Sequence, residues 1–311
     1  MRYDDILGAI GNTPLVGVHA LSPNPEVKIW AKLEGQNPGG SSKDRIALKM
    51  IELAEEERRL DPGATILEPS SGNTGIGLAL VAKLRGYKLR VVMPENVSVE
   101  RRQLLEIFGA EVTVSPGAEG SNGAIRMAEK IAAEEPEYVM LFQYGNPANP
   151  LAHFEATGPE ILRDCPEIDV FVAGLGTSGT LMGAGKYLKQ HKPSVRVVAV
   201  EPPSGELVQG LRNLDDGFVP PIFEPGVLDR KFIVRPRESV ELTRRLLDEC
   251  GVFAGISSGA AAAGAVKMAA NMESGTIVVL LPDGGWKYLS SGAWTDPIDD
   301  VVERATRINY W

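Results

Sequence analysis

The feature that most constrains the fold is the alternation of short apolar strands with longer helical segments. Strand patterns occur at 87–93, 111–114, 169–173 and 195–200, and helical patterns occur at 75–85, 99–108 and 180–190. Gly86 and Gly109 directly follow two of the helical segments, at the position where a left-handed residue commonly ends a helix. A strand–helix–strand rhythm is typical of parallel sheets covered by helices on both faces. The sequence therefore predicts an α/β protein.

Length and composition allow two such α/β units. The chain has 311 residues, of which 43% are hydrophobic, and this is enough for two domains of ordinary size. A turn-dense segment at 145–150 could be a hinge between them, although an ordinary surface loop is equally consistent with its composition. The proline-rich segment 202–225 lacks periodicity, and a loop of that length inside a compact domain is usually functional.

Charge and cysteine content argue against several classes of function. With 32 basic and 41 acidic residues the net charge is −9, which is unfavourable for binding nucleic acid or an acidic membrane. No apolar run is long enough to span a membrane, and the acidic N-terminus does not resemble a signal peptide. Cys165 and Cys250 form no C-x-x-C pair, and the three histidines lack ligand spacing. We therefore expect a cytoplasmic protein without a disulfide framework or a metal site.

A lysine at the end of a small-residue loop is the first candidate for catalysis. Lys43 ends the run Asn-Pro-Gly-Gly-Ser-Ser-Lys, 37–43, where this loop enters a helix. The preceding turn residues restrict its backbone, and the positive end of the helix dipole disfavours the charged amine. Such an amine suits nucleophilic attack on an aldehyde or carbonyl. The alternative is an ordinary solvated lysine at the surface.

Two more loops share a design in which a small-residue turn opens a helix. The first reads Ser-Ser-Gly-Asn-Thr-Gly, 70–75, and its backbone N–H groups and hydroxyls could bind a carboxylate or a phosphate. The other reads Gly-Ile-Ser-Ser-Gly, 255–259, and opens an alanine-rich helix. For both loops the alternative is a plain N-cap turn, with serine as the cap in the second.

The loop at 174–180 reads Gly-Leu-Gly-Thr-Ser-Gly-Thr and follows a predicted strand. It matches the G-x-G-x-x-G pattern of dinucleotide-binding proteins, and Glu201 follows at about the expected spacing. The hydroxyls of this loop instead suit a terminal phosphate dianion, and the loop lies mid-chain, whereas the dinucleotide pattern normally opens the sheet. By itself the motif leaves both NAD and another phosphorylated cofactor open.

Taken in order, these motifs resemble those of the cysteine synthase family, which are pyridoxal 5′-phosphate (PLP) enzymes of fold type II. The likeness runs from Gly-Asn-Thr-Pro-Leu, 11–15, to the end of the chain. It implies two α/β domains with parallel or mixed sheets, similar to the tryptophan synthase β fold, and the cofactor between them. The larger domain, 1–36 with 146–311, would bind the cofactor phosphate. The smaller, mobile domain, 37–145, would bind substrate, and the family is usually homodimeric.

The resemblance also implies roles for individual residues. Lys43 would hold the cofactor as a Schiff base and then take the α-proton of the substrate. Asn73 would bind the ring hydroxyl of the cofactor, and Ser257 would face its pyridine nitrogen. The cofactor phosphate would be bound by Gly176, Thr177, Ser178, Gly179 and Thr180. The substrate carboxylate would be bound by Ser70, Ser71, Gly72, Thr74 and Gln143.

A serine opposite the pyridine nitrogen indicates the type of reaction. The Ser257 hydroxyl cannot hold a pyridinium as an aspartate does, so the ring stays neutral and is a weaker electron sink. Transamination and racemisation are then disfavoured, whereas loss of the α-proton together with a β-leaving group is favoured. The resulting aminoacrylate is open to attack by a sulfur nucleophile. We therefore expect a transferase of cysteine biosynthesis that makes L-cysteine from O-phospho-L-serine or O-acetyl-L-serine.

The segment 210–220 is especially similar to the cysteine synthase B type, which uses O-phosphoserine. There Arg212 would bind the substrate phosphate, because a guanidinium matches a phosphate in a bidentate geometry. A surface arginine paired with Asp215 or Asp216 is the alternative. Enzymes of this branch can take sulfur from a small thiocarboxylated carrier protein, and their C-terminal tail can lie in the cleft. Here the tail 307–311, which ends in two aromatic residues, could close the cleft or pack elsewhere.

Other interpretations stay open. The chain could be an O-acetylserine sulfhydrylase or a cystathionine β-synthase-like enzyme, although 311 residues leave no room for the regulatory modules of the latter. It could be a non-catalytic homologue whose site serves as a docking groove, although such a protein would not need Lys43. A NAD-binding protein is the remaining alternative.

Overall fold

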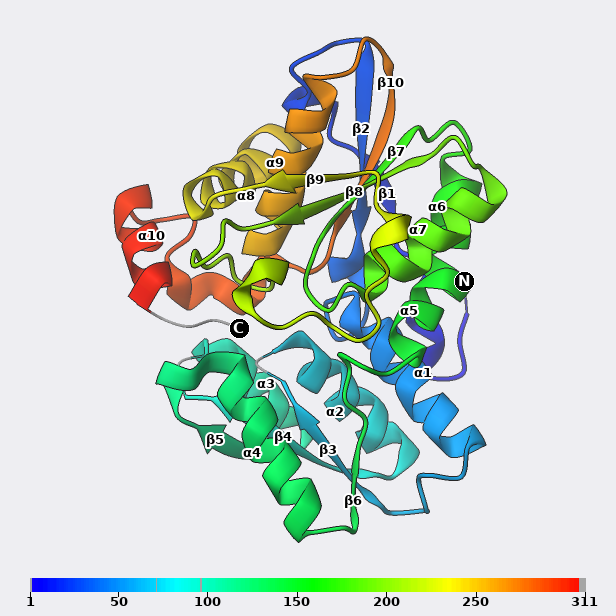
Figure 1. Ribbon diagram of the computed structural model, residues 1–311, viewed down its shortest axis with the longest axis vertical. Helices are drawn as coiled ribbons and strands as arrows, with labels where there is room; N and C mark the ends of the chain where they lie inside the picture. Colours follow the sequence, from blue (N-terminus) through cyan, green and yellow to red (C-terminus); the bar gives the residue numbers. More distant parts are fainter. Residues whose placement is uncertain (1, 71, 96, 308–311) are drawn as a thin grey trace.

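The computed structural model describes residues 2–70, 72–95 and 97–307 (Figure 1). Within these ranges the strands are β1 (Leu15–Gly17), β2 (Val27–Leu33), β3 (Thr65–Pro69), β4 (Lys88–Pro94), β5 (Glu111–Ser115), β6 (Tyr138–Met140), β7 (Val170–Gly174), β8 (Arg196–Glu201), β9 (Arg230–Ile233) and β10 (Gly275–Leu281). The helices are α1 (Lys43–Glu56), α2 (Asn73–Arg85), α3 (Val99–Phe108), α4 (Gly120–Glu134), α5 (Ala148–Ala152), α6 (Gly158–Asp164), α7 (Gly179–His191), α8 (Pro236–Cys250), α9 (Ile256–Ala269) and α10 (Ile298–Arg307). The predicted alternation of strands and helices is confirmed.

The described strands form two sheets, which lie one above the other in Figure 1. The larger has six strands in the order β1-β2-β10-β7-β8-β9, and the smaller has four in the order β5-β4-β3-β6. All neighbouring strands are parallel except β1, which runs antiparallel to β2. The predicted fold class, with one parallel and one mixed sheet, is therefore confirmed.

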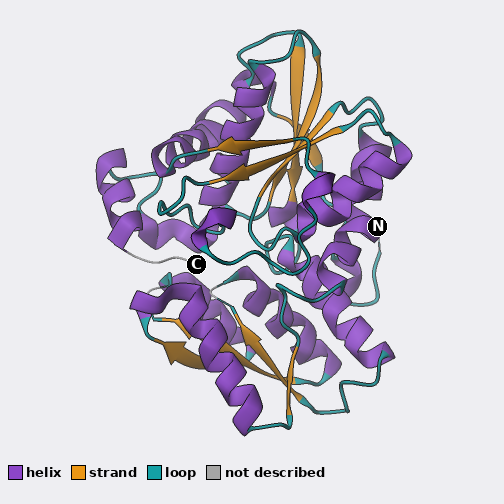
Figure 2. Ribbon diagram, in the orientation of Figure 1, coloured by secondary structure: helices purple, strands orange, loops and turns teal. Residues whose placement is uncertain are grey.

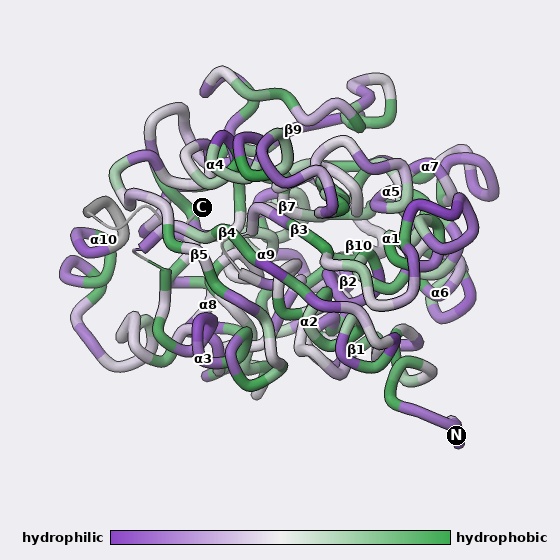
Figure 3. The backbone as a smooth tube through the Cα atoms, turned by 90° about the horizontal axis from the view of Figure 1, so that it is seen from below, coloured by the Kyte–Doolittle hydropathy of each residue, from purple (hydrophilic) through white to green (hydrophobic). Residues whose placement is uncertain are grey.

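Helices cover both faces of each sheet (Figure 2). On the larger sheet α9 packs on one face, with α8 against it, and α7 packs on the other with α6. On the smaller sheet α4 covers one face, while α2 and α3 cover the other and α1 packs on α2. Because both faces are buried, the central strands are continuous apolar runs. In Figure 3 these strands are mostly green, whereas the outer helices α6 and α10 are largely purple.

Glycines end two helices as predicted. Gly86 caps α2 with φ 79° and Gly109 caps α3 with φ 89°. Both angles lie in the left-handed region, which glycine adopts without the steric penalty of a Cβ atom. The ends of β4, β5, β7 and β8 differ from the predicted strand ends by no more than one residue. These small differences arise because the ends of strands lack a punctuating residue such as the glycine that ends a helix.

The two sheets are built from different stretches of the chain, while the domain division at 37–145 stays a prediction. The smaller sheet uses strands between residues 65 and 140, and the larger uses strands at 15–33 and 170–281. The N-terminal segment joins the larger sheet because β2 pairs with β10. The segment 145–150, considered as a hinge, includes the start of α5, which packs against both α1 and α7. Movement of the two units against each other stays a prediction. In the described part of the chain, every helix is too short or too polar to cross a membrane.

A close helix contact gives a test of the packing. A Cβ atom built on Gly183 in α7 would lie 2.0 Å from the carbonyl oxygen of Pro150 and 2.7 Å from the Cβ of His153. In an exposed helix a change from glycine to alanine stabilises by about 1 kcal/mol, but here overpacking outweighs that gain. We expect Gly183→Ala to lower the free energy of unfolding by about 3 kcal/mol, measured by thermal or urea unfolding. Gly226→Ala is the control because nothing lies within 4 Å of its Cβ position; an equally stable Gly183→Ala variant would contradict the packing.

Candidate active site

The predicted site residues meet in one cleft at the carboxyl ends of the parallel strands. Loops that follow β3, β7 and β10 line it, together with Lys43 and part of the long loop between β8 and β9. The sequence-predicted residues that line this cleft are Lys43, Ser70, Gly72, Asn73, Thr74, Gln143, Gly176, Thr177, Arg212 and Ser257. Ser178, Gly179 and Thr180 line an adjoining recess, which also contains Lys43. Ser71 lies outside the described residues. Open parallel sheets commonly bind ligands at this edge.

Lys43 is the first residue of α1 and projects into both the cleft and the recess. Its Nζ lies 3.3 Å from the hydroxyl oxygen of Ser42, and its backbone N–H donates to the hydroxyl of Ser41. Burial lowers the pKa of the Lys43 amine, and the nearby carboxylates, of which Asp283 acts most, oppose this effect. The amine is thus easier to deprotonate than a solvated lysine, as nucleophilic attack and base catalysis require.

The loop at 174–180 has the features of a phosphate site. Ser178 adopts a left-handed conformation with φ 70°, and its hydroxyl is buried without a hydrogen-bond partner among the described residues. A Cβ on Gly179 would lie 1.8 Å from Oδ1 of Asn149, so this turn admits only glycine. The Asn149 amide also donates to the Thr177 hydroxyl. An unpaired hydroxyl at the start of a 13-residue helix fits a terminal phosphate dianion.

Glu201 does not act as the acidic partner that a dinucleotide site requires. Its side chain is 1% exposed and forms an ion pair with Lys231 at 2.7 Å. It lines neither the cleft nor the adjoining recess. The geometry therefore gives no support to the NAD interpretation, in which this carboxylate would bind a ribose.

The loop at 70–75 is held by its own side chains. The Ser70 hydroxyl accepts hydrogen bonds from the backbone N–H groups of Gly72 and Gly75. The Thr74 hydroxyl donates to Oε1 of Gln143 at 2.6 Å. The N-cap of α2 is Gly72, which offers no side-chain cap, and the Ser70 hydroxyl satisfies the Gly75 N–H of the first turn instead. The loop instead places hydroxyl and amide groups around one point of the cleft.

Ser257 occupies a different local structure from the one considered at first. Helix α9 begins at Ile256 with Gly255 as its N-cap, so Ser257 and Ser258 belong to its first turn and neither caps it. The serine N-cap alternative is wrong, because Gly255 occupies the cap position. Ser257 lines the cleft beside Gly210, whose Cβ position lies 3.3 Å from the Ser257 hydroxyl.

Arg212 lies inside the cleft and not on the surface. It is only 8% exposed, and its guanidinium carbon lies 4.7 Å from the centre of the Phe218 ring and 5.5 Å from that of Tyr144. The proline-rich loop between β8 and β9 carries it there, so the functional interpretation of that loop is supported. The surface alternative for Arg212 is wrong, because aromatic rings hold its planar guanidinium at the cleft wall.

Several cleft residues were missed by the sequence reasoning. They are Arg101, Ser121, Tyr144, Leu211, Pro282 and Tyr288. His153, to which no chemistry was assigned, lies behind the phosphate loop, with Nε2 3.2 Å from the Thr180 hydroxyl. Burial lowers the pKa of His153 to about 3, so it is neutral. Leu211 lies in the segment 210–220 that resembles the cysteine synthase B type, and this was the signal for it.

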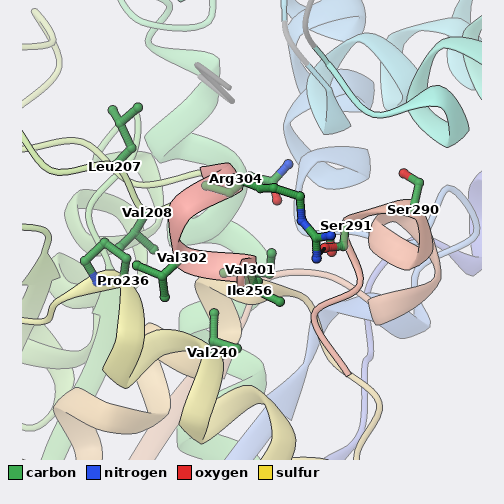
Figure 4. A pocket seen from close by; sticks show the side chains of 11 residues that line it. Leu207, Val208, Pro236, Val240, Ile256, Ser290, Ser291, Val301, Val302 and Arg304 are labelled. Atoms are coloured by element: carbon green, nitrogen blue, oxygen red, sulfur yellow. Dashed lines mark hydrogen bonds between the residues drawn. The ribbon is translucent and has the colours of Figure 1, made fainter. Parts of the chain in front are cut away.

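A second pocket lies between α8, α10 and the segment 207–209 (Figure 4). Aliphatic side chains such as Val240 and Val301 form most of its wall. Arg304 is the charged residue at its rim, and its guanidinium donates to the carbonyl of Ser291. No lysine is among the residues that line this pocket, so Schiff-base chemistry belongs to the cleft that holds Lys43.

Comparisons with known proteins agree with this geometry. Residues 6–283 match the protein family described as pyridoxal-phosphate dependent enzyme. A cysteine synthase of Staphylococcus aureus (strain Mu50 / ATCC 700699) is 45% identical over 298 residues, which are 93% of this chain and 96% of the relative. The chain belongs to the cysteine synthase family.

Solved structures of known enzymes are similar over almost the whole chain. A cysteine synthase (OASS) of Entamoeba histolytica matches with a TM-score of 0.89 at 33% identity and covers 99% of this chain and 96% of its own. An O-ureido-L-serine synthase matches with a TM-score of 0.89 at 40% identity and covers 94% and 96%. The cofactor of this cysteine synthase family member is PLP, so the NAD interpretation is wrong. The unpaired Ser178 hydroxyl and the Lys43 amine in one recess fit its phosphate and its aldehyde.

Proposed function

We propose that this enzyme makes L-cysteine by β-replacement on O-phospho-L-serine. The observation that carries the proposal is the buried guanidinium of Arg212 in the same cleft as Lys43. A guanidinium in a partly desolvated site binds a phosphate by two parallel charge-assisted hydrogen bonds. An acetyl ester presents no anion to it. Arg101, which is also buried, adds a second positive charge to the cleft wall.

We assign the other cleft residues as follows. Bound PLP supplies the electron sink that lets the α-proton of the amino acid leave. Lys43 binds the cofactor and then takes this proton with its amine. Ser70, Gly72, Thr74 and Gln143 bind the substrate carboxylate, Asn73 binds the ring hydroxyl, and Ser257 faces the ring nitrogen. Gly176, Thr177, Ser178, Gly179 and Thr180 bind the cofactor phosphate. The fixed hydrogen bond between Thr74 and Gln143 supports the carboxylate site, since it orients both side chains before substrate arrives.

O-acetyl-L-serine is the second candidate substrate. A structurally similar protein of E. histolytica is described as O-acetyl serine sulfhydrylase isoform 3. Both esters would place the amino acid on the same loop at 70–75, so the two candidates differ only in what faces the β-substituent. Arg212 at that position favours the phosphate ester.

Side-by-side turnover of the two esters tests the proposal. With sulfide as the sulfur donor, we expect kcat/KM for O-phosphoserine to exceed that for O-acetylserine by about 10- to 100-fold, as one or two charge-assisted hydrogen bonds predict. Cysteine formation is measured for both, with release of phosphate or acetate as the second readout. Faster turnover of the acetyl ester would overturn the substrate assignment and leave the PLP chemistry intact.

Three further proposals concern the setting of the enzyme. They are a small thiocarboxylated carrier protein as the sulfur donor, a homodimeric assembly and a cytoplasmic location. The tail considered as a lid, 307–311, lies outside the described residues except for the backbone of residue 307. Comparing turnover with free sulfide and with a thiocarboxylated carrier tests the first, and the sedimentation velocity of the purified enzyme tests the second.

A further inference from the structure

The Asn73 amide is held between two buried groups of opposite charge. Its Oδ1 accepts a hydrogen bond from Nζ of Lys287 at 2.8 Å, and its Nδ2 donates to Oδ2 of Asp283 at 2.7 Å. Lys287 is 0% exposed and Asp283 is 1% exposed. Both residues follow β10, whereas Asn73 opens α2 on the other sheet. The contact therefore joins the two halves of the cleft at one side chain.

These two charges allow only one orientation of the amide. If the amide were reversed, its NH₂ group would face the Lys287 ammonium and its oxygen would face the Asp283 carboxylate. Both contacts would be repulsive and would leave buried charges without partners, which is costly. An amide nitrogen carries two hydrogens, and one N–H of Asn73 donates its hydrogen bond to Asp283. Since Asn73 lines the cleft, the other N–H is available to an acceptor there.

The surroundings keep Lys287 in place. The Ser98 hydroxyl donates to the Lys287 carbonyl, and the amine packs against Gly40, where a Cβ would lie 3.3 Å from Nζ. Burial lowers the pKa of Lys287 to about 8, while Asp283 and Asp44 act to keep it charged and Arg101 and Lys43 oppose them. The amine is therefore mostly an ammonium at neutral pH. The Tyr288 hydroxyl donates to Asp283 and holds the carboxylate.

We propose that Lys287 is a positioning residue for PLP binding. Lys287 fixes the orientation of the Asn73 amide, so that the free N–H of Asn73 points to the ring oxygen of the cofactor. This rests on the proposed role of Asn73. A ring oxygen that carries negative charge accepts such a hydrogen bond, and a reversed amide would present a repelling oxygen to it. Lys287 thus acts on cofactor binding through Asn73, without touching the cofactor.

A double-mutant cycle on cofactor affinity tests this. Apoenzyme is prepared, PLP is titrated, and the dissociation constant is read from the visible absorbance. We expect Lys287→Met and Asn73→Ala each to weaken PLP binding by about tenfold, as loss of one hydrogen bond predicts. Because Lys287 acts through Asn73, the double variant should bind no more weakly than Asn73→Ala alone. Independent, multiplying effects, or unchanged affinity in Lys287→Met, would overturn the inference.

Lys32→Met is the matched control. Lys32 is also 0% exposed and buried in a charged cluster, where it donates to the Thr13 carbonyl and pairs with Glu160. Its loss should lower the melting temperature and leave PLP affinity unchanged. If Lys287→Met does not fold, Lys287→Gln replaces it in the same cycle. Unchanged affinity in Asn73→Ala would instead show that the role proposed for Asn73 is wrong.

Discussion

Lys43→Ala is expected to lower kcat for cysteine formation by at least about 10³-fold, since one side chain supplies both the covalent link to PLP and the base for the α-proton. The structure supports both tasks. Lys43 is the first residue of α1, its amine lies beside the phosphate loop, and the pKa of this amine is lowered. A second readout is reduction with borohydride followed by peptide mapping, which should label residue 43 in the unmodified enzyme.

Lys49→Ala is the control for this experiment. Lys49 belongs to the same helix, but it is partly exposed and pairs with Glu155. We expect its replacement to leave turnover and labelling unchanged. Full activity of Lys43→Ala, or a pyridoxyl label at another residue, would contradict the proposed mechanism as a whole.

Arg212→Ala is expected to lower kcat/KM for O-phosphoserine by about 10- to 100-fold and to change that for O-acetylserine by less than about threefold. The first estimate is the loss of 1.5–3 kcal/mol of charge-assisted hydrogen bonding, and the second follows because the acetyl ester carries no anion. For Arg212→Lys, kcat/KM with O-phosphoserine should lie between the values of the unmodified enzyme and of Arg212→Ala. The reason is that an ammonium keeps the charge but not the bidentate geometry. Initial rates with both esters give the measurement.

Arg230→Ala is a matched control, because its guanidinium also lies over an aromatic ring, 5.0 Å from the centre of Phe232, but outside the cleft. The Arg230→Ala change should leave kcat/KM unchanged for both O-phosphoserine and O-acetylserine. Equal losses with both esters in Arg212→Ala would mean that Arg212 supports the cleft wall and does not recognise the phosphate.

The fold class and the loops could be predicted from sequence because their causes are local. A glycine with positive φ ends α2 and α3 wherever the helices pack. Strands buried on both faces are apolar runs in any parallel sheet. The serine N-cap alternative for the loop 255–259 failed because glycine and serine are both acceptable N-caps, and only the backbone decides between them.

The sequence by itself determined the loops that carry Lys43, Asn73 and the phosphate site, because the chemistry of each lies within a few neighbouring residues. The tertiary structure decided which distant groups complete them. Lys287 and Asp283 reach Asn73 across 214 and 210 residues of chain. They do so because β10 lies between β2 and β7, and its end faces the other sheet. Strand order depends on packing of the whole chain, and no local pattern encodes it.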